Sequence, residues 1–90
     1  MTDFPIPPQH APMGRLDAID VGDRKLTVQT EFFAAPTWRI ETKVFLGGAL
    51  KKTFTEEVDP ADEASLQAII DLFHEAKYAE IIEGLRGLNR

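Results

Sequence analysis

Cysteine is absent from this sequence of 90 residues. The chain can therefore form no disulfide bond, and it offers neither a thiolate nucleophile nor a thiolate ligand for a metal ion. Small domains that fold without disulfides are typical of reducing compartments. The absence of cysteine therefore favours a cytoplasmic protein.

Long apolar runs and an excess of basic residues are missing as well. No apolar stretch approaches the roughly 20 residues that a membrane-spanning helix requires. The first residues lack the basic region and apolar core of a signal peptide. The net charge of -5 argues against nucleic acids and anionic membranes as partners. We therefore expect a partner that is another protein or a second copy of the chain.

Proline, in contrast, is concentrated at one end of the chain. Four of the six prolines lie within residues 1–14. Proline removes a backbone donor and disrupts both helices and strand ladders. We predict a flexible, proline-rich tail over residues 1–14 and a single α+β domain over residues 15–90. A polyproline ligand for an aromatic groove is the alternative interpretation of the tail.

Two segments alternate apolar and polar residues, as half-buried strands do. One face of LTVQTEFF carries Leu26, Val28, Thr30 and Phe32, and one face of TWRIETKVF carries Trp38, Ile40, Thr42 and Val44. Keeping the apolar sets together predicts an antiparallel register with Phe32 opposite Trp38, Val28 opposite Thr42 and Leu26 opposite Val44. Residues 15–21 alternate more weakly, so the sequence leaves open whether they form a paired strand.

Residues 39–54 (RIETKVFLGGALKKTF) predict a β-hairpin around a double glycine. A two-residue turn would pair Val44 with Lys51 and turn apolar residues towards solvent. A three-residue loop instead pairs Val44 with Leu50 and gives Gly48 the left-handed conformation that such loops require. We therefore predict the three-residue loop, with three pairs on the buried face: Val44–Leu50, Thr42–Lys52 and Ile40–Phe54.

The clearest signal is a helix near the end of the chain. Asp59 is a capping residue, and Pro60 follows at the first helical position. Acidic residues come next, where the helix dipole favours them, and Gly84 predicts the stop. Residues at helical spacing form a stripe that we expect to lie on the sheet: Leu66, Ile69, Ile70, Phe73, Ala76 and Lys77. The predicted fold is a three- or four-stranded antiparallel meander with one C-terminal helix packed across one sheet face.

The helical phase shifts after Ala76 by roughly 100°. His74, Tyr78, Ile81, Ile82 and Leu85 centre on this second direction. Either the helix breaks near Lys77 and a short segment folds back on the core, or its second half packs on something else. A symmetric copy of the chain is the simplest candidate for that second surface.

Residue types that carry catalysis or metal binding are sparse. His74 lies near Asp71 and Glu75, but a metal site needs further ligands, so we interpret His74 as part of a solvated helix face. The acidic residues over 56–63 lack the spacing of a calcium loop and instead compensate the helix dipole. The sequence therefore predicts no catalytic residues, no cofactor site and no metal site, and it favours a non-enzymatic protein.

The polar face of the sheet interleaves charges of both signs, which is typical of a wet surface. Apolar side chains that could contact a partner lie at its strand ends or on the second half of the helix. We predict a protein-interaction or oligomerisation module, most simply a homodimer, with an interface that includes Phe33, Phe45, Tyr78, Ile82 and Leu85. The alternative is a small-ligand-binding or catalytic subunit whose site forms between chains from Trp38, Lys52, His74 or Tyr78.

Overall fold

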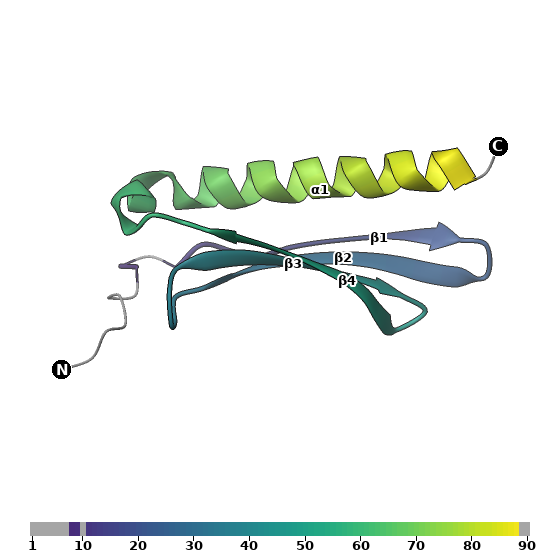
Figure 1. Ribbon diagram of the computed structural model, residues 1–90, viewed down its shortest axis with the longest axis horizontal. Coiled ribbons are helices and arrows are strands. Elements are labelled where there is room, and N and C mark those ends of the chain that lie inside the picture. Colours follow the sequence, from purple (N-terminus) through teal and green to yellow (C-terminus); the bar gives the residue numbers. More distant parts are fainter. Residues whose placement is uncertain (1–7, 10, 89–90) are drawn as a thin grey trace.

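The computed structural model describes residues 8–9 and 11–88. Four antiparallel strands, in the order of the chain, form one sheet, and a helix lies along one of its faces (Figure 1). The elements are β1 (Arg15–Val21), β2 (Arg24–Phe33), β3 (Arg39–Leu46), β4 (Ala49–Glu57), the short 3-10 helix η1 (Pro60–Ser65) and α1 (Leu66–Leu88). The predicted α+β fold, with a meander and one C-terminal helix, is confirmed, and residues 15–21 are a paired strand.

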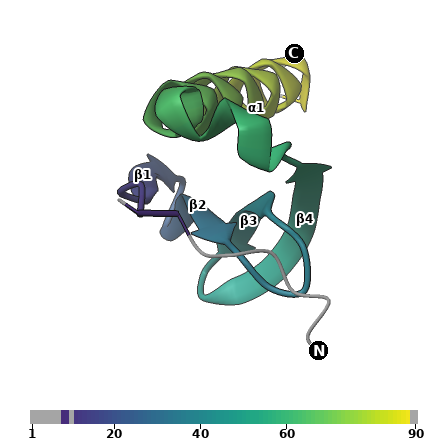
Figure 2. The ribbon, with the colours of Figure 1, turned by 90° about the vertical axis from the view of Figure 1, so that its left-hand side faces the viewer.

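The sheet curls around the helix, with β1 and β4 at its two edges (Figure 2). Among the described residues, α1 packs against β1, β2 and β3 but makes no close backbone contact with β4. The strand β4 is consequently exposed along almost its whole length. We call the helix-covered side of the sheet the inner face and the opposite side the outer face.

Two apolar clusters on the inner face form the core. The first lies under the first half of α1 and consists of Trp38, Ile40, Val58, Leu66 and Ile70. The second consists of Leu26, Val28 and Val44, with Tyr78, Ile81 and Leu85 of the helix packed against it. Burying large apolar side chains contributes about 1.5–3 kcal/mol for each one. Both halves of the helix therefore face the same side of the same sheet.

The register of β2 and β3 differs from the predicted one by two residues. The observed pairs include Phe32–Ile40, Val28–Val44 and Leu26–Leu46. A shift by two leaves every side chain on its predicted face, because side chains alternate with a period of two. The reason lies in the connection between the strands. Trp38 precedes β3 rather than belonging to it, and its ring packs edge-on against Phe32, with centroids 5.4 Å apart.

The β3–β4 turn has two residues rather than the predicted three. Gly47 and Gly48 adopt positive φ angles of 60° and 85°, as a type I′ turn requires, and Leu46 lies opposite Ala49. A β-bulge then interrupts the pairing, because Phe45 lies opposite Leu50 while Val44 lies opposite Lys52. Lys51 is the extra residue of this bulge.

The bulge changes which side chains of β4 face the helix. Phe54 lies opposite Thr42 on the inner face, two residues from its predicted partner Ile40. Lys52 also lies on the inner face, but opposite Val44 rather than Thr42. The prediction that Leu50 is buried is wrong, because Leu50 lies on the outer face and is 53% exposed. A two-residue turn without a bulge would have placed Phe54 on the outer face, so the bulge restores the inner position.

The helix begins as predicted but ends later. The Asp59 carboxylate accepts a hydrogen bond from the backbone N–H of Ala61 at 2.9 Å, and Pro60 occupies the first helical position. The first turns form the 3-10 helix η1, and α1 begins at Leu66. The predicted stop at Gly84 is wrong, because α1 continues to Leu88. The break near Lys77, which the sequence left open, does not occur, because α1 is continuous through that residue.

The stripe of α1 that packs on the sheet is also continuous. Leu66, Ile70 and His74 are buried at a spacing of four residues, and Tyr78, Ile81 and Leu85 extend the same stripe. Ala76, which the sequence had placed in the stripe, is exposed. The apparent shift of phase therefore arises because His74 belongs to the stripe and Ala76 does not.

Candidate functional site

A layer of polar side chains separates the two apolar clusters of the core. Thr30 on β2, Thr42 on β3 and His74 on α1 are all completely buried. The predicted solvated position of His74 is therefore wrong. Along each element these residues lie between members of the first cluster and members of the second. Such a layer is tolerated in a core only when its polar atoms are hydrogen-bonded.

The polar atoms of this layer bond to one another. The Oγ1 atoms of Thr30 and Thr42 lie 2.7 Å apart, and Thr30 Oγ1 lies 2.7 Å from His74 Nδ1. On the other side of the ring, His74 Nε2 lies 2.7 Å from Asp17 Oδ2 of β1. The Tyr78 ring stacks parallel to the imidazole, with centroids 6.3 Å apart. Within the described residues, no buried side-chain nitrogen or oxygen lacks a hydrogen-bond partner.

A carboxylate, an imidazole and a hydroxyl in a chain are also the arrangement that activates a nucleophile in hydrolases. Here the hydroxyl is that of Thr30, which is completely buried and is bonded onward to Thr42. A substrate has no access to such an oxygen. We therefore assign the chain of Asp17, His74, Thr30 and Thr42 a structural role, which joins β1, β2 and β3 to α1.

Arg15 extends the polar connection between β1 and α1 to the surface. Its guanidinium donates hydrogen bonds to Glu75 Oε1 at 2.7 Å and to Asp71 Oδ1 at 3.0 Å. The hydrogen bond that Arg15 donates to Glu75, and then the one it donates to Asp71, raise the pKa of Arg15 above its ordinary value. Asp17 lies 4.0 Å from the same guanidinium. The edge strand β1 is thus fastened to the helix at Arg15 and at Asp17.

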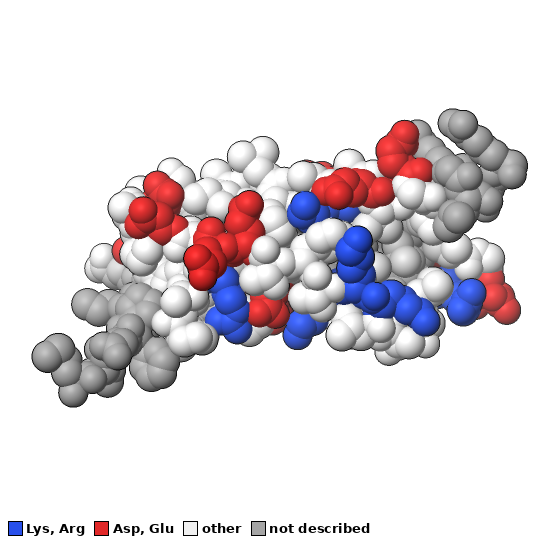
Figure 3. Space-filling model, in the orientation of Figure 1, with Lys and Arg blue, Asp and Glu red and all other residues white. Residues whose placement is uncertain are grey.

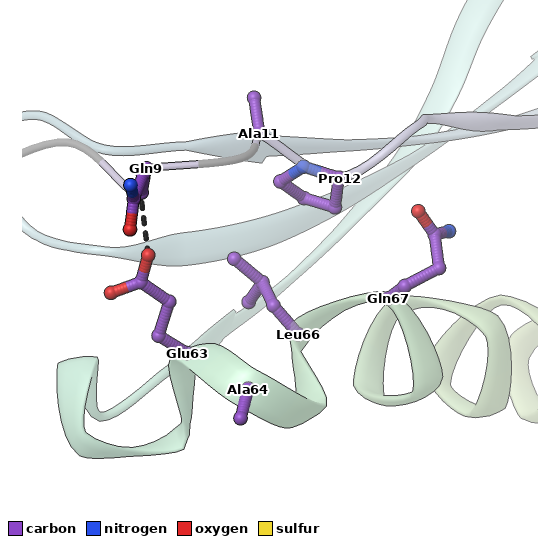
Figure 4. Close-up of a pocket in the computed structure, with 7 residues that line it drawn as sticks. All are labelled: Gln9, Ala11, Pro12, Glu63, Ala64, Leu66 and Gln67. Atoms are coloured by element: carbon purple, nitrogen blue, oxygen red, sulfur yellow. Dashed lines mark hydrogen bonds between the residues drawn. The ribbon is translucent and has the colours of Figure 1, made fainter.

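A hollow of about 550 Å³ lies where the N-terminal segment crosses the start of the helix (Figure 4). The side chains of Glu63 and Gln67, which line it, are already bonded to that segment. The Glu63 carboxylate accepts a hydrogen bond from the Gln9 backbone N–H at 2.7 Å. Gln67 accepts one from the Met13 N–H at 2.8 Å and donates one to the Met13 carbonyl at 3.1 Å. The hollow therefore offers no set of free polar groups converging on a ligand.

The structure scatters the five residues predicted to form an interface. Tyr78 and Leu85 are half-buried against the second apolar cluster, so the premise that they lack a place on the sheet is wrong. Ile82 is half-buried on the same helix. Phe33 and Phe45 lie near opposite ends of the outer face, one at the end of β2 and one near the end of β3. No single patch brings the five together.

The outer face has the character that the sequence predicted for a wet surface. Arg39 donates to the Glu41 carboxylate at 2.7 Å, and its guanidinium lies 4.7 Å from the centre of the Phe33 ring. Gln29 donates to the carboxylate of Glu31, the next outward-facing residue of the same strand. Arg39, Glu41 and Glu31 thus each have a hydrogen-bond partner within this face, and the hollow between β2 and β3 measures only about 100 Å³.

The edge strand β4 is the most exposed element of the sheet. Eight of its nine residues are exposed, and only Phe54 is partly shielded. The ammonium groups of Lys52 and Lys77 lie 4.7 and 5.0 Å from the centre of the Phe54 ring. Figure 3 shows basic side chains across the middle of one face and acidic side chains along the helix and towards the left. The sequence predicted a strand here but not its exposure, because the exposure depends on where the helix lies.

The described residues contain no group of three or more His, Cys, Asp or Glu that could hold a metal ion. Their helices include none with the length and apolar character needed to cross a membrane. In comparisons with known proteins, no family model, no curated protein and no solved structure matches the chain. Function is therefore inferred from the geometry of the described residues.

Proposed function

We propose that this protein is a non-enzymatic interaction module that associates with a second copy of itself through β4. The observation that supports the proposal is the exposure of eight of the nine residues of an edge strand with which α1 makes no close backbone contact. An edge strand presents unpaired N–H and C=O groups that another strand can pair with. Small domains also gain stability by burying such surface against a symmetric copy.

The other edge of the sheet is less suited to this role. The inner side chains of β1 include Arg15 and Asp17, which are engaged by the helix. Its exposed outer side chains are Leu16, Ala18 and Asp20, of which only Asp20 is charged, so two β1 strands would gain no attraction between opposite charges on this face. The alternative of a ligand site between chains gains no support, because Trp38 and His74 are buried. A cytoplasmic location, which the absence of cysteine favours, belongs to the same proposal.

Light scattering on the full chain at high micromolar concentration tests the proposal. We expect the mass of a dimer for the natural sequence. Replacing Thr53 and Thr55 with lysine (Thr53→Lys and Thr55→Lys) places like charges on the exposed outer side of β4, and we expect the mass of a monomer. The matched control is Leu16→Lys with Ala18→Lys, which adds the same charge to the outer side of β1 and should leave the dimer intact.

Three results would contradict the proposal. One is a natural chain that stays monomeric at high micromolar concentration. Another is a dimer that survives the β4 changes but dissociates with the β1 control. The third is a folded monomer produced by Ile82→Asp when the β4 changes have no effect, which would move the interface to the helix surface predicted from the sequence. Circular dichroism on each variant confirms that the domain is folded.

A further inference from the structure

We infer that two β4 strands pair antiparallel with Phe54 of one copy directly opposite Phe54 of the second copy. This inference rests on the proposed function and specifies how the two copies recognise each other. It comes from the order of side chains along the strand, KKTFTEE over residues 51–57. Lysines precede Phe54 and glutamates follow it at equal distances, so the strand is complementary in charge to its own reverse.

The complementarity appears when the strand is laid against its own reverse. Two positions before Phe54 is Lys52, and two positions after it is Glu56. Both lie on the inner face, opposite Val44 and Ile40 of β3. In the inferred pair, Lys52 of each copy lies opposite Glu56 of the other. Two-fold symmetry makes this attraction occur twice, and opposite charges directly across strands stabilise a sheet.

The remaining positions agree with the same register. Thr53 of each copy lies opposite Thr55 of the other, and threonines are well suited to cross-strand pairs. Lys51 precedes this segment as the bulge residue, and Glu57 follows it. The two Phe54 rings meet at the two-fold axis of the inferred pair. In the single chain this side chain is only partly shielded from solvent.

Neighbouring registers lose these contacts. Residues directly opposite in an antiparallel pair share one face of the sheet. Moving the centre of the pair by one residue along β4 therefore gives each residue a partner two positions away, on the same face. Centring the pair on Thr53 places Lys52 opposite Phe54, and centring it on Thr55 places Glu56 opposite Phe54. Centring it on Lys52 or on Glu56 places like charges opposite each other. Only the register centred on Phe54 pairs both charges with their opposites.

The fold leaves room for this arrangement. A two-fold axis perpendicular to the sheet keeps the inner faces of both copies on the same side. Each helix covers β1, β2 and β3 of its own copy and leaves β4 without close backbone contact. The two helices would therefore flank the central pair of β4 strands rather than collide above it. The result is a continuous eight-stranded sheet.

Lysines and bulges on an edge strand also protect proteins from unwanted pairing. The bulge lies at the start of β4, between Leu50 and Lys52, and leaves residues 52–57 in regular pairing with β3. A purely protective edge needs no acidic residues placed symmetrically to its lysines. Here the lysine disfavours uncharged strands, and the glutamate supplies the matched partner that only a second copy carries.

Charge exchange across the pair tests the register. Lys52→Glu alone creates two Glu–Glu pairs, and Glu56→Lys alone creates two Lys–Lys pairs, so we expect each to weaken the dimer by about tenfold or more. The double variant restores opposite charges and has the natural composition and net charge, so its dimer should return. An equimolar mixture of the two single variants should form a heterodimer for the same reason. Sedimentation at low ionic strength measures each dissociation constant.

Single cysteines give a second test, because the natural chain has none. Thr53→Cys and Thr55→Cys lie directly opposite each other between copies in the inferred register. Under mild oxidation the mixture of the two should form a disulfide-linked dimer, whereas each alone should not, since its own thiols are offset along the strands. A disulfide from Thr53→Cys alone would overturn the register.

The two proposals fail in different ways. A natural chain that is a dimer, but whose affinity is unchanged by Lys52→Glu and by Glu56→Lys, overturns the register and leaves dimerisation through β4 standing. Failure of the double variant to restore a dimer lost in both single variants overturns the register too. A natural chain that is monomeric overturns the proposed function and, with it, this inference.

Discussion

His74 Nε2 lies 2.7 Å from Asp17 Oδ2, which bonds a completely buried ring on α1 to a carboxylate on the edge strand β1. The other ring nitrogen reaches Thr30 in the middle of the sheet. Through this one side chain the helix is connected to an edge strand and to the two central strands. The ring therefore fixes the position of the helix more specifically than apolar packing can.

His74→Phe tests this contribution to stability. Phenylalanine keeps the ring but leaves the Thr30 hydroxyl and the Asp17 carboxylate without the imidazole. We expect the free energy of unfolding to fall by about 1–3 kcal/mol, because two hydrogen bonds are lost and each contributes about 0.5–1.5 kcal/mol net. Urea unfolding followed by circular dichroism measures it. His74→Ala should cost more, because it adds a cavity, and a His74→Phe variant as stable as the natural chain would show that the bonds contribute no net stability.

The helix stripe predicts a graded response to truncation. Ile70 is completely buried in the first cluster, so Ile70→Ala should cost about 2–5 kcal/mol. Leu72, two positions along the same helix, is 71% exposed, so Leu72→Ala should change stability by no more than about 0.5 kcal/mol. Phe73 is only partly buried, so Phe73→Ala should fall between them. Equal effects at Ile70 and Leu72 would mean that the helix faces the sheet differently.

The acidic partners of Arg15 predict a salt-dependent effect. Arg15→Gln removes the cation and leaves Asp71, Glu75 and Asp17 near one another, so stability should fall at low ionic strength. Screening by salt weakens this repulsion, so the loss should shrink at high salt. The raised pKa of Arg15 means that its charge is complete at neutral pH, and its contribution would be lost only at strongly alkaline pH. A loss that is independent of salt would contradict an electrostatic role.

The N-terminal segment is expected to add little stability. The hydrogen bonds that join Gln9 and Met13 to the helix are exposed to solvent, and exposed bonds of this kind contribute modestly. A chain that begins at Gly14 should lose about 1 kcal/mol or less. Thermal unfolding of the shortened and natural chains measures the difference. A larger loss would show that the segment packs on the helix.

Local patterns in the sequence were sufficient to predict β2 and β3 and the faces of their side chains. The alternation of Leu26, Val28 and Thr30 gave the correct inner face of β2, and Asp59 followed by Pro60 gave the start of the helical region. These features depend on neighbours in the chain, because side-chain period and capping are local properties.

Features that depend on distant residues were not predicted. His74 was interpreted as part of a solvated helix face because the sequence supplies no further metal ligands for it, yet its partners Asp17 and Thr30 lie 57 and 44 residues away in the sequence. The bulge at Lys51 could not be inferred either. It is needed only because a two-residue turn at Gly47 and an inward-facing Phe54 occur in the same hairpin, and the sequence did not predict that turn. The exposure of β4 depends on the position of the helix over β1–β3.

The bulge at Lys51 leaves one residue of the hairpin without a partner in β3. With a two-residue turn and no bulge, a strand shortened by this one lysine would still bring Lys52 opposite Val44 and Phe54 opposite Thr42, because the residue removed has no partner in β3. Loss of one residue at this point therefore straightens the strand and keeps both of its faces. The start of β4 is the place in the sheet where a change in chain length can be absorbed without exchanging the buried and exposed sides.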